Sequence, residues 1–205
     1  GDLTLTAYIH LSFSSPFGAM PSILTGKNFP YITGELYNAD ELILSDIADR
    51  MPLRPLPNFE NLTLLKKIKL GINIFDFKNL TLFKKVRFTN IEQGKYLIKI
   101  YKENPIFSKE RNFIGYSVVE VKKDSKTHIY CSHEGHLKVS IFDQNNNPLK
   151  DVTANLFLDD MIISSNISSK EGFCVLRAPC SLKQEYKLKL FHKGLLIDEQ
   201  KINIG

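Results

Sequence analysis

The residues from Leu3 to Phe13 alternate strictly between apolar and polar side chains. The apolar positions are Leu3, Leu5, Ala7, Ile9, Leu11 and Phe13, and the positions between them are Thr4, Thr6, Tyr8, His10 and Ser12. Successive side chains of a strand point to opposite faces of its sheet, so this period of two predicts a β-strand with one buried face. Eleven residues would extend over roughly 36 Å, about twice the length of a typical strand.

A long apolar strand of this kind has two alternative positions in a folded protein. It can be the first strand of its own sheet, or it can complete the sheet of another copy by donor-strand exchange. Burial of five large side chains would contribute roughly 8–15 kcal/mol before ordering costs, which is enough for a durable joint. A strand donated head to tail joins two different surfaces, so such an assembly grows into a fibre.

The composition is that of an ordinary globular protein. The chain has 205 residues, of which 43% are hydrophobic and 24% charged, with a net charge of +5. This length allows one large domain or two small ones. The lysines are scattered singly or in pairs, so the sequence predicts no nucleic-acid partner. No segment reaches the ~18 apolar residues of a membrane span. The first residue is Gly1, which suggests a processed form and leaves the compartment open.

The remainder of the chain reads as strands. Residues 38–51 are the only helical candidate, since Leu42, Ile43 and Ile47 would share one face of a helix. From residue 64 onward, short alternating segments are separated by turn residues. Segments of the two halves resemble each other, which suggests tandem sandwiches. The predicted fold is therefore all-β, with an N-terminal donor strand (residues 1–15) and two immunoglobulin-like β-sandwich modules (residues 16–132 and 133–205).

The second predicted module resembles the carboxypeptidase-regulatory-like and transthyretin-like β-sandwiches of cell-surface proteins. The resemblance lies in four runs, at residues 137–143, 147–149, 152–156 and 169–173, followed by the strand at 186–190. The family usually has Asp-Gly before the phenylalanine of the fourth run, and here the pair is Glu171-Gly172. The resemblance covers about a third of the chain and implies a fold without catalytic residues.

The order of a free alternating strand followed by sandwich modules resembles the subunits of archaeal thread filaments. Those are cell-surface fibres built by donor-strand complementation, in the manner of chaperone–usher pilins. The resemblance implies an extracellular homopolymer of identical subunits, with a role in adhesion or biofilm. It also implies that five side chains plug the groove of the next subunit: Leu3, Leu5, Ile9, Leu11 and Phe13.

Two further sets of residues bear on an extracellular location. Asn-x-Ser/Thr sequons occur at Asn61, Asn79 and Asn166, a number near what chance gives, and in a surface protein they would be sites for N-linked glycans. The three cysteines, Cys131, Cys174 and Cys180, lack the spacing of a zinc site. They allow one disulfide in an oxidising compartment or three buried thiols in a reducing one.

The sequence offers little that indicates catalysis, so we predict no enzyme activity, no cofactor and no metal. The cluster His133-Glu134-Gly135-His136 is not a His-Glu-x-x-His metal motif, and we expect a solvated linker there. Asp159-Asp160 would point to opposite faces of a strand, which favours a hairpin tip.

Three hypotheses for the function remain. The leading one is a structural subunit of an extracellular filament, polymerised through its N-terminal strand. The alternative is a monomeric binding module of a surface adhesin or S-layer-associated protein, for example one that binds carbohydrate, in which residues 1–13 pair within the same chain. The third is an accessory domain of a secreted enzyme, whose catalytic part this sequence does not contain.

Overall fold

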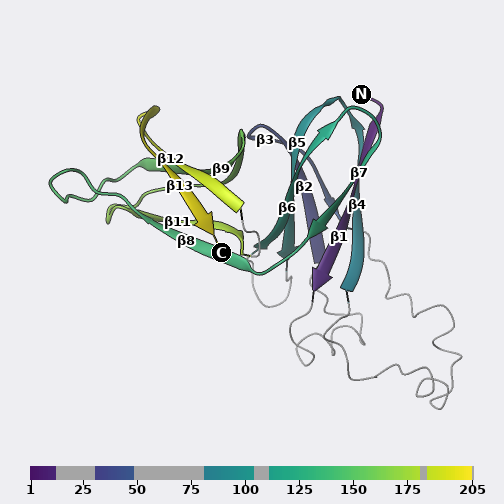
Figure 1. The fold of residues 1–205 in the computed structure, drawn as a ribbon, viewed down its shortest axis with the longest axis horizontal. Coiled ribbons are helices and arrows are strands. Elements are labelled where there is room, and N and C mark those ends of the chain that lie inside the picture. Colours follow the sequence, from purple (N-terminus) through teal and green to yellow (C-terminus); the bar gives the residue numbers. More distant parts are fainter. Residues whose placement is uncertain (13–30, 49–80, 104–110, 181–183, 205) are drawn as a thin grey trace, which may run out of the picture.

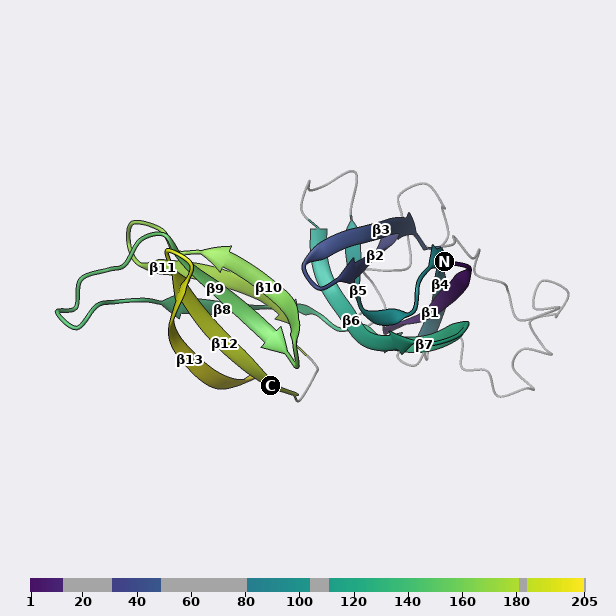
Figure 2. The same cartoon turned by 90° about the horizontal axis from the view of Figure 1, so that it is seen from above.

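The computed structural model describes residues 1–12, 31–48, 81–103, 111–180 and 184–204. Every regular element of secondary structure in these ranges is a β-strand, which confirms the predicted all-β class (Figure 1). The described residues contain no helix with the length and apolarity that a membrane crossing requires. The strands form two packed units that lie beside each other along the long axis of the molecule (Figure 2).

The first unit packs two sheets around one hydrophobic core. Its strands are β1 (Leu3–Ser12), β2 (Tyr31–Asn38), β3 (Glu41–Ile47), β4 (Thr81–Ile91), β5 (Gly94–Glu103), β6 (Arg111–Val121) and β7 (Ser125–Tyr130). One sheet has the strand order β4-β1-β7 and the other has the order β3-β2-β5-β6. The core between them includes Phe88, Ile98 and Ile129, each at most 1% exposed.

Strand β1 occupies the centre of the three-stranded sheet. It pairs antiparallel with β4 and parallel with β7, so both of its edges are hydrogen-bonded within the same chain. Leu5, Ala7 and Ile9 are completely buried, and Leu3 and Leu11 are partly buried against the same core. The alternation in the sequence therefore predicted both the strand and its buried face.

The pairing of β1 distinguishes, for the single chain, between a strand of its own sheet and a strand donated to another copy. In the single chain, β1 completes its own sheet, which is the arrangement that the binding-module alternative predicts. Four of the five expected plug residues contact the core of their own unit, and Phe13 lies outside the described residues. Exchange of β1 between subunits stays a prediction.

The second unit has the strands β8 (Glu134–Ser140), β9 (Val152–Leu158), β10 (Met161–Ile167), β11 (Phe173–Pro179), β12 (Gln184–His192) and β13 (Leu195–Ile204). A sheet of order β10-β9-β12-β13 packs against the pair β11-β8. Leu156, Ile163, Leu176 and Tyr186 fill the space between the two sheets and are at most 1% exposed.

One sequence-based prediction of secondary structure is wrong, and one strand was missed. The helix expected within residues 38–51 is instead the hairpin β2–β3, which turns at Ala39 with a positive φ of 52°. Backbone pairing with β2 prevails over a weak helical periodicity, and β3 is left as an exposed edge strand. Strand β10 was not predicted. Its partner β9 ends just before Asp159-Asp160, which form the hairpin tip as expected.

The predicted division into residues 1–15, 16–132 and 133–205 stays a prediction. Leu97, Phe113 and Tyr116 come from β5 and β6 of the first unit, yet they belong to the hydrophobic cluster of the second unit. The core of the second unit therefore continues into the first. The first alternating segments that the sequence predicts from residue 64 onward, up to residue 80, lie outside the described residues.

We predict that Ile9→Ala lowers the free energy of unfolding by about 2–5 kcal/mol, because it leaves a cavity at a completely buried position. Ile43→Ala on the edge strand β3 is the matched control, since Ile43 is 42% exposed, and we expect a loss below about 1 kcal/mol. Urea denaturation of both variants measures the difference. Equal effects of the two substitutions would contradict the central position of β1.

Candidate ligand-binding cleft between the two units

The two units are joined by buried aromatic side chains. The phenol oxygens of Tyr116 on β6 and Tyr186 on β12 are 2.6 Å apart, and the Tyr116 hydroxyl also lies 3.0 Å from the Gln184 side-chain oxygen. Burial raises the pKa of both tyrosines, so both phenols stay protonated at neutral pH. Phe113 packs against Tyr116 in the same cluster. We call this set of residues the aromatic joint.

Glu134 links the units through polar contacts beside the aromatic joint. Its carboxylate accepts a hydrogen bond of 2.5 Å from the backbone N–H of Phe113. It also lies 3.0 Å from His136 and 3.7 Å from the guanidinium of Arg177. The Glu134 side chain is only 7% exposed. The expectation of a solvated linker at residues 133–136 is therefore wrong for Glu134, because its carboxylate is held between the first unit and β11.

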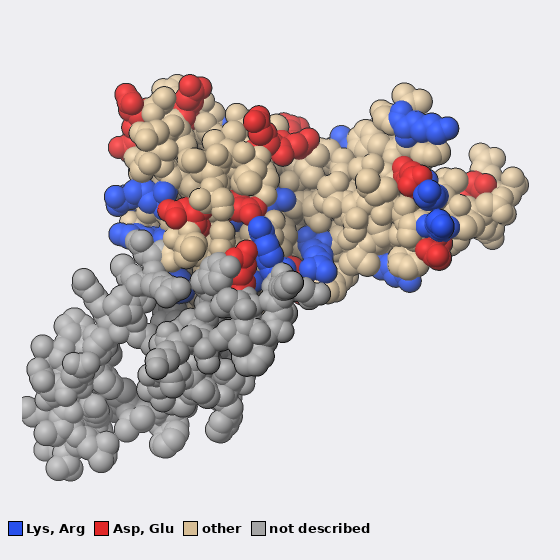
Figure 3. Space-filling view, turned by 180° about the vertical axis from the view of Figure 1, so that it is seen from behind, with Lys and Arg blue, Asp and Glu red and all other residues tan. Residues whose placement is uncertain are grey.

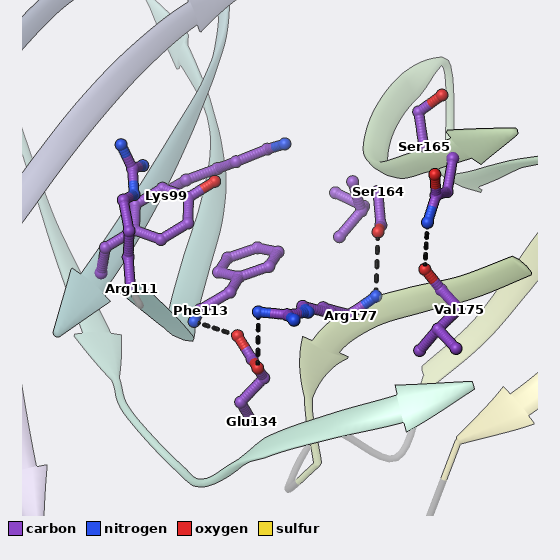
Figure 4. A pocket seen from close by; sticks show the side chains of 11 residues that line it. Lys99, Arg111, Phe113, Glu134, Ser164, Ser165, Val175 and Arg177 are labelled. Carbon is purple, nitrogen blue, oxygen red and sulfur yellow. Dashed lines mark hydrogen bonds and ion pairs between the residues drawn. The ribbon is translucent and has the colours of Figure 1, made fainter. Parts of the chain in front are cut away.

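A cleft of about 380 Å³ opens next to these contacts. One wall comes from β5 and β6 of the first unit, and the other from β10 and β11 of the second (Figure 4). The lining residues are Lys99, Tyr101, Arg111, Phe113, Glu134, Ile163, Ser164, Ser165, Asn166, Val175 and Arg177. Acidic and basic side chains lie next to one another where the two units meet (Figure 3). We call this space the interunit cleft.

Arg111 is held in place by three neighbours. Its guanidinium lies 2.6 Å from the carboxylate of Glu35 and 3.6 Å from that of Glu103. It also stacks 3.7 Å from the centre of the Tyr101 ring. The Tyr37 hydroxyl donates a short hydrogen bond to Glu35, which fixes this nearly buried carboxylate from a second side. The positive charge of Arg111 is thus compensated by two carboxylates.

Lys99 projects from the same wall into the interunit cleft (Figure 4). Its ammonium lies 4.9 Å from the Tyr37 ring centre and 5.5 Å from that of Phe113. Among the described residues, no carboxylate lies within 4 Å of it. Burial lowers the pKa of Lys99 to about 8, and the more distant Glu35 only partly opposes this effect. Lys99 is therefore the one cation of the described lining that has no carboxylate within ion-pair distance.

The opposite wall presents polar groups that are already ordered. The Ser164 hydroxyl accepts a hydrogen bond from the backbone N–H of Arg177, and the Asn166 amide donates one to the Val175 carbonyl. Ser165 donates to Asn155 on the neighbouring strand. The Asn166 side-chain oxygen accepts a further hydrogen bond from the backbone N–H of Ile167. Ser164 thus keeps its hydroxyl donor and Asn166 keeps one amide N–H, whereas the Ser165 hydroxyl is engaged toward β9.

Of the three sequons, only the one at Asn166 lies within the described residues. Asn61 and Asn79 lie outside the described residues. Asn166 is exposed on the edge strand β10, but its side chain also hydrogen-bonds the backbone of Val175 and lines the interunit cleft. The sequon serine, Ser168, is buried and bonded to Leu149 and Val152. Glycosylation at these sites stays a prediction.

The three cysteines are free thiols in the structure, and no disulfide joins them. Burial raises the pKa of Cys131 to about 12 and also raises the pKa of Cys174, so neither forms a reactive thiolate at neutral pH. Cys180 is exposed beside the linker between the units. Within the described residues, no group of three or more His, Cys, Asp or Glu side chains could hold a metal ion.

The interunit cleft was missed by the sequence analysis because its residues come from separate strands. A signal was nevertheless present in β5, where Tyr96-Leu97-Ile98-Lys99-Ile100-Tyr101 is apolar or aromatic at nearly every position. A strand apolar on both faces is covered on both faces. Lys99 falls on the face shared by Leu97 and Tyr101, so it had to lie against another layer of the protein.

Comparisons with known proteins leave the family open. No protein-family model matches the chain, and no curated protein matches its sequence. Among solved structures, the Bacillus anthracis TIE protein matches with 12% identity and a TM-score of 0.32, over 99% of this chain. The chain spans about a third of that protein, 32% of its length. GBS52, the minor pilin of Streptococcus agalactiae, matches with 14% identity and a TM-score of 0.30, over 99% of this chain and 90% of the pilin. Neither is an archaeal thread subunit, and similarity at these TM-scores carries no argument about function.

We predict that Lys99→Met stabilises the protein at pH 7 by about 1–3 kcal/mol, because it removes a cation that burial disfavours. The pKa of Lys99 is lower in the folded than in the unfolded chain. Stability of the wild-type protein should therefore rise as the pH increases from about 8 to 10, and this rise should be smaller in the variant. Urea denaturation across this pH range measures both effects. A destabilised Lys99→Met protein would show that Lys99 has a structural partner.

Proposed function

We propose that the chain is a non-catalytic segment of a cell-surface protein of the pilus or adhesin type, in which two β-sandwich units form one stiff body with a binding cleft at their junction. The observation that carries this proposal is the aromatic joint, where the core of the second unit continues into β5 and β6 of the first. A joint of this kind suits a surface protein, because it keeps a binding site in a fixed position relative to the rest of the protein.

Filament formation by exchange of β1 is the second candidate. It is favoured by the central position of β1, whose side chains fill a groove between two sheets just as a donated strand would. In this scheme the strand of one subunit takes the place of β1 in the next, and adhesion or biofilm formation follows from the fibre.

Labelling of intact cells of the native host tests the surface location. An antibody against this chain should label unpermeabilised cells, and brief protease treatment of intact cells should remove the signal. An antibody against a cytoplasmic protein of the same cells is the control. Labelling that appears only after permeabilisation would contradict the proposed function.

Removal of residues 1–12 tests the role of β1. We expect the truncated protein to be unstable alone and to regain the stability of the full chain when a synthetic peptide of residues 1–12 is added, because the peptide restores three completely buried side chains. Negative-stain electron microscopy of the full chain separates the two candidates. Fibres that disappear on truncation support strand exchange, whereas single particles support a β1 that remains in its own sheet.

A further inference from the structure

The cations around the interunit cleft differ in how they are compensated. Arg111 faces the carboxylates of Glu35 and Glu103, and Arg177 faces that of Glu134. Lys99 has no ion pair within the described part of the chain, although it lies in the same cleft. Three cations and three carboxylates give these residues no net charge, but the carboxylates pair closely with Arg111 and Arg177, and none forms an ion pair with the ammonium of Lys99.

The burial of Lys99 makes this imbalance costly. A lysine ordinarily extends into water, whereas this one lies between the rings of Tyr37 and Phe113. These rings interact favourably with a cation, but they do not replace the hydration that the ammonium loses. An anion in the cleft would provide the missing countercharge and would favour the protonated form of Lys99.

The charge and shape of the cleft select the kind of anion. A single uncompensated cation suits a monoanion better than a dianion, because Glu134 would repel the second negative charge. The volume of about 380 Å³ lies within the range of small-molecule sites. The opposite wall carries Ser164 and Asn166, whose hydroxyl and amide groups can hydrogen-bond a hydroxylated ligand.

We propose that the interunit cleft binds one acidic sugar residue, with its carboxylate at the ammonium of Lys99 and its hydroxyl groups along the β10 wall. Arg177 lies across the cleft from Lys99 and offers the remaining guanidinium N–H groups to the same ligand (Figure 4). This inference rests on the binding cleft of the proposed function and names its ligand class, and it holds whether or not the chain forms filaments.

The site should respond to pH through Lys99. The charged groups that act on its ammonium are Glu35 on β2, Arg111 on β6 and Asp40, and the rings of Tyr37 and Phe113 lie beside it. Tyr101, Glu134 and Arg177 line the same cleft. A carboxylate binds the protonated lysine, so affinity should be nearly constant below about pH 7 and should fall as the pH rises through about 8. With the pKa of free Lys99 at about 8, binding at pH 9 should be roughly tenfold weaker than at pH 7.

The experiment is a titration of the intact chain with D-glucuronate, followed by ¹H–¹⁵N NMR. Three comparison ligands separate the contributions: D-glucose lacks the carboxylate, acetate lacks the hydroxyl groups, and D-glucose 6-phosphate carries a second negative charge. We expect glucuronate to bind at least tenfold more tightly than any of the three and to shift the resonances of β5, β10 and β11. Carbon-13 titration of the lysine side chains should show that the pKa of Lys99 rises on binding.

Two variants test whether glucuronate binds at Lys99. Lys99→Met should weaken glucuronate binding at least tenfold, whereas Lys95→Met, an exposed lysine on the same strand, should change it less than twofold. Unaltered binding by Lys99→Met, absent binding of glucuronate, or tighter binding of glucose 6-phosphate would each overturn the proposal. Because these measurements use purified protein, they can fail while surface labelling succeeds, so the two proposals are tested separately.

Discussion

The aromatic joint is the contact on which the rest of the structure depends. Tyr116 and Tyr186 share a buried hydrogen bond of 2.6 Å, and Phe113 and Leu97 extend the second unit's core beneath it. A buried hydroxyl that loses its partner costs about 1–3 kcal/mol, so separation of the two units is penalised at this point. The interunit cleft exists because the joint holds β5 and β6 opposite β10 and β11.

The environment of Lys99 indicates that the aromatic joint holds a binding site in place. Neighbouring cations in the cleft have close carboxylate partners, whereas Lys99 is half-buried without an ion pair, at a cost in stability. Proteins commonly retain such destabilising groups where function requires them. A residue that served only for packing would be replaced by an apolar side chain of similar size without loss. The position of Lys99 therefore links the architecture of the two units to ligand binding.

The sequence predicted the strands whose side chains alternate, and the structure explains where it failed. Leu5 and Ile9 were recognised because every second residue of β1 faces the core. Strand β3 was interpreted as a helix because its four apolar side chains are all exposed at the edge of the sheet. Its sequence therefore lacks the apolar–polar alternation by which a half-buried strand is recognised. Strand β10 lacks regular alternation because its register shifts between Ile162 and Ser164.

The site itself could be predicted only in part. Lys99 lies in a strand that is apolar on both faces, and this pattern indicates a covered lysine. The remaining members of the site cannot be found from spacing, because Glu134 on β8 and Arg177 on β11 meet through strand pairing across a long stretch of sequence. Arg111 on β6 reaches them only through the packing of the two units. The partner of Glu134 is a backbone N–H, which no sequence pattern identifies.

The central claim is that the aromatic joint fixes the two units relative to each other and so preforms the interunit cleft. Residual dipolar couplings of the backbone N–H groups test it most directly, since they report the orientation of each unit in a common frame. We predict that a single alignment tensor fits the couplings of both units when the units have the relative orientation seen in the structure. Two tensors of different magnitude would mean that the units move independently, and the account of a preformed cleft would be wrong.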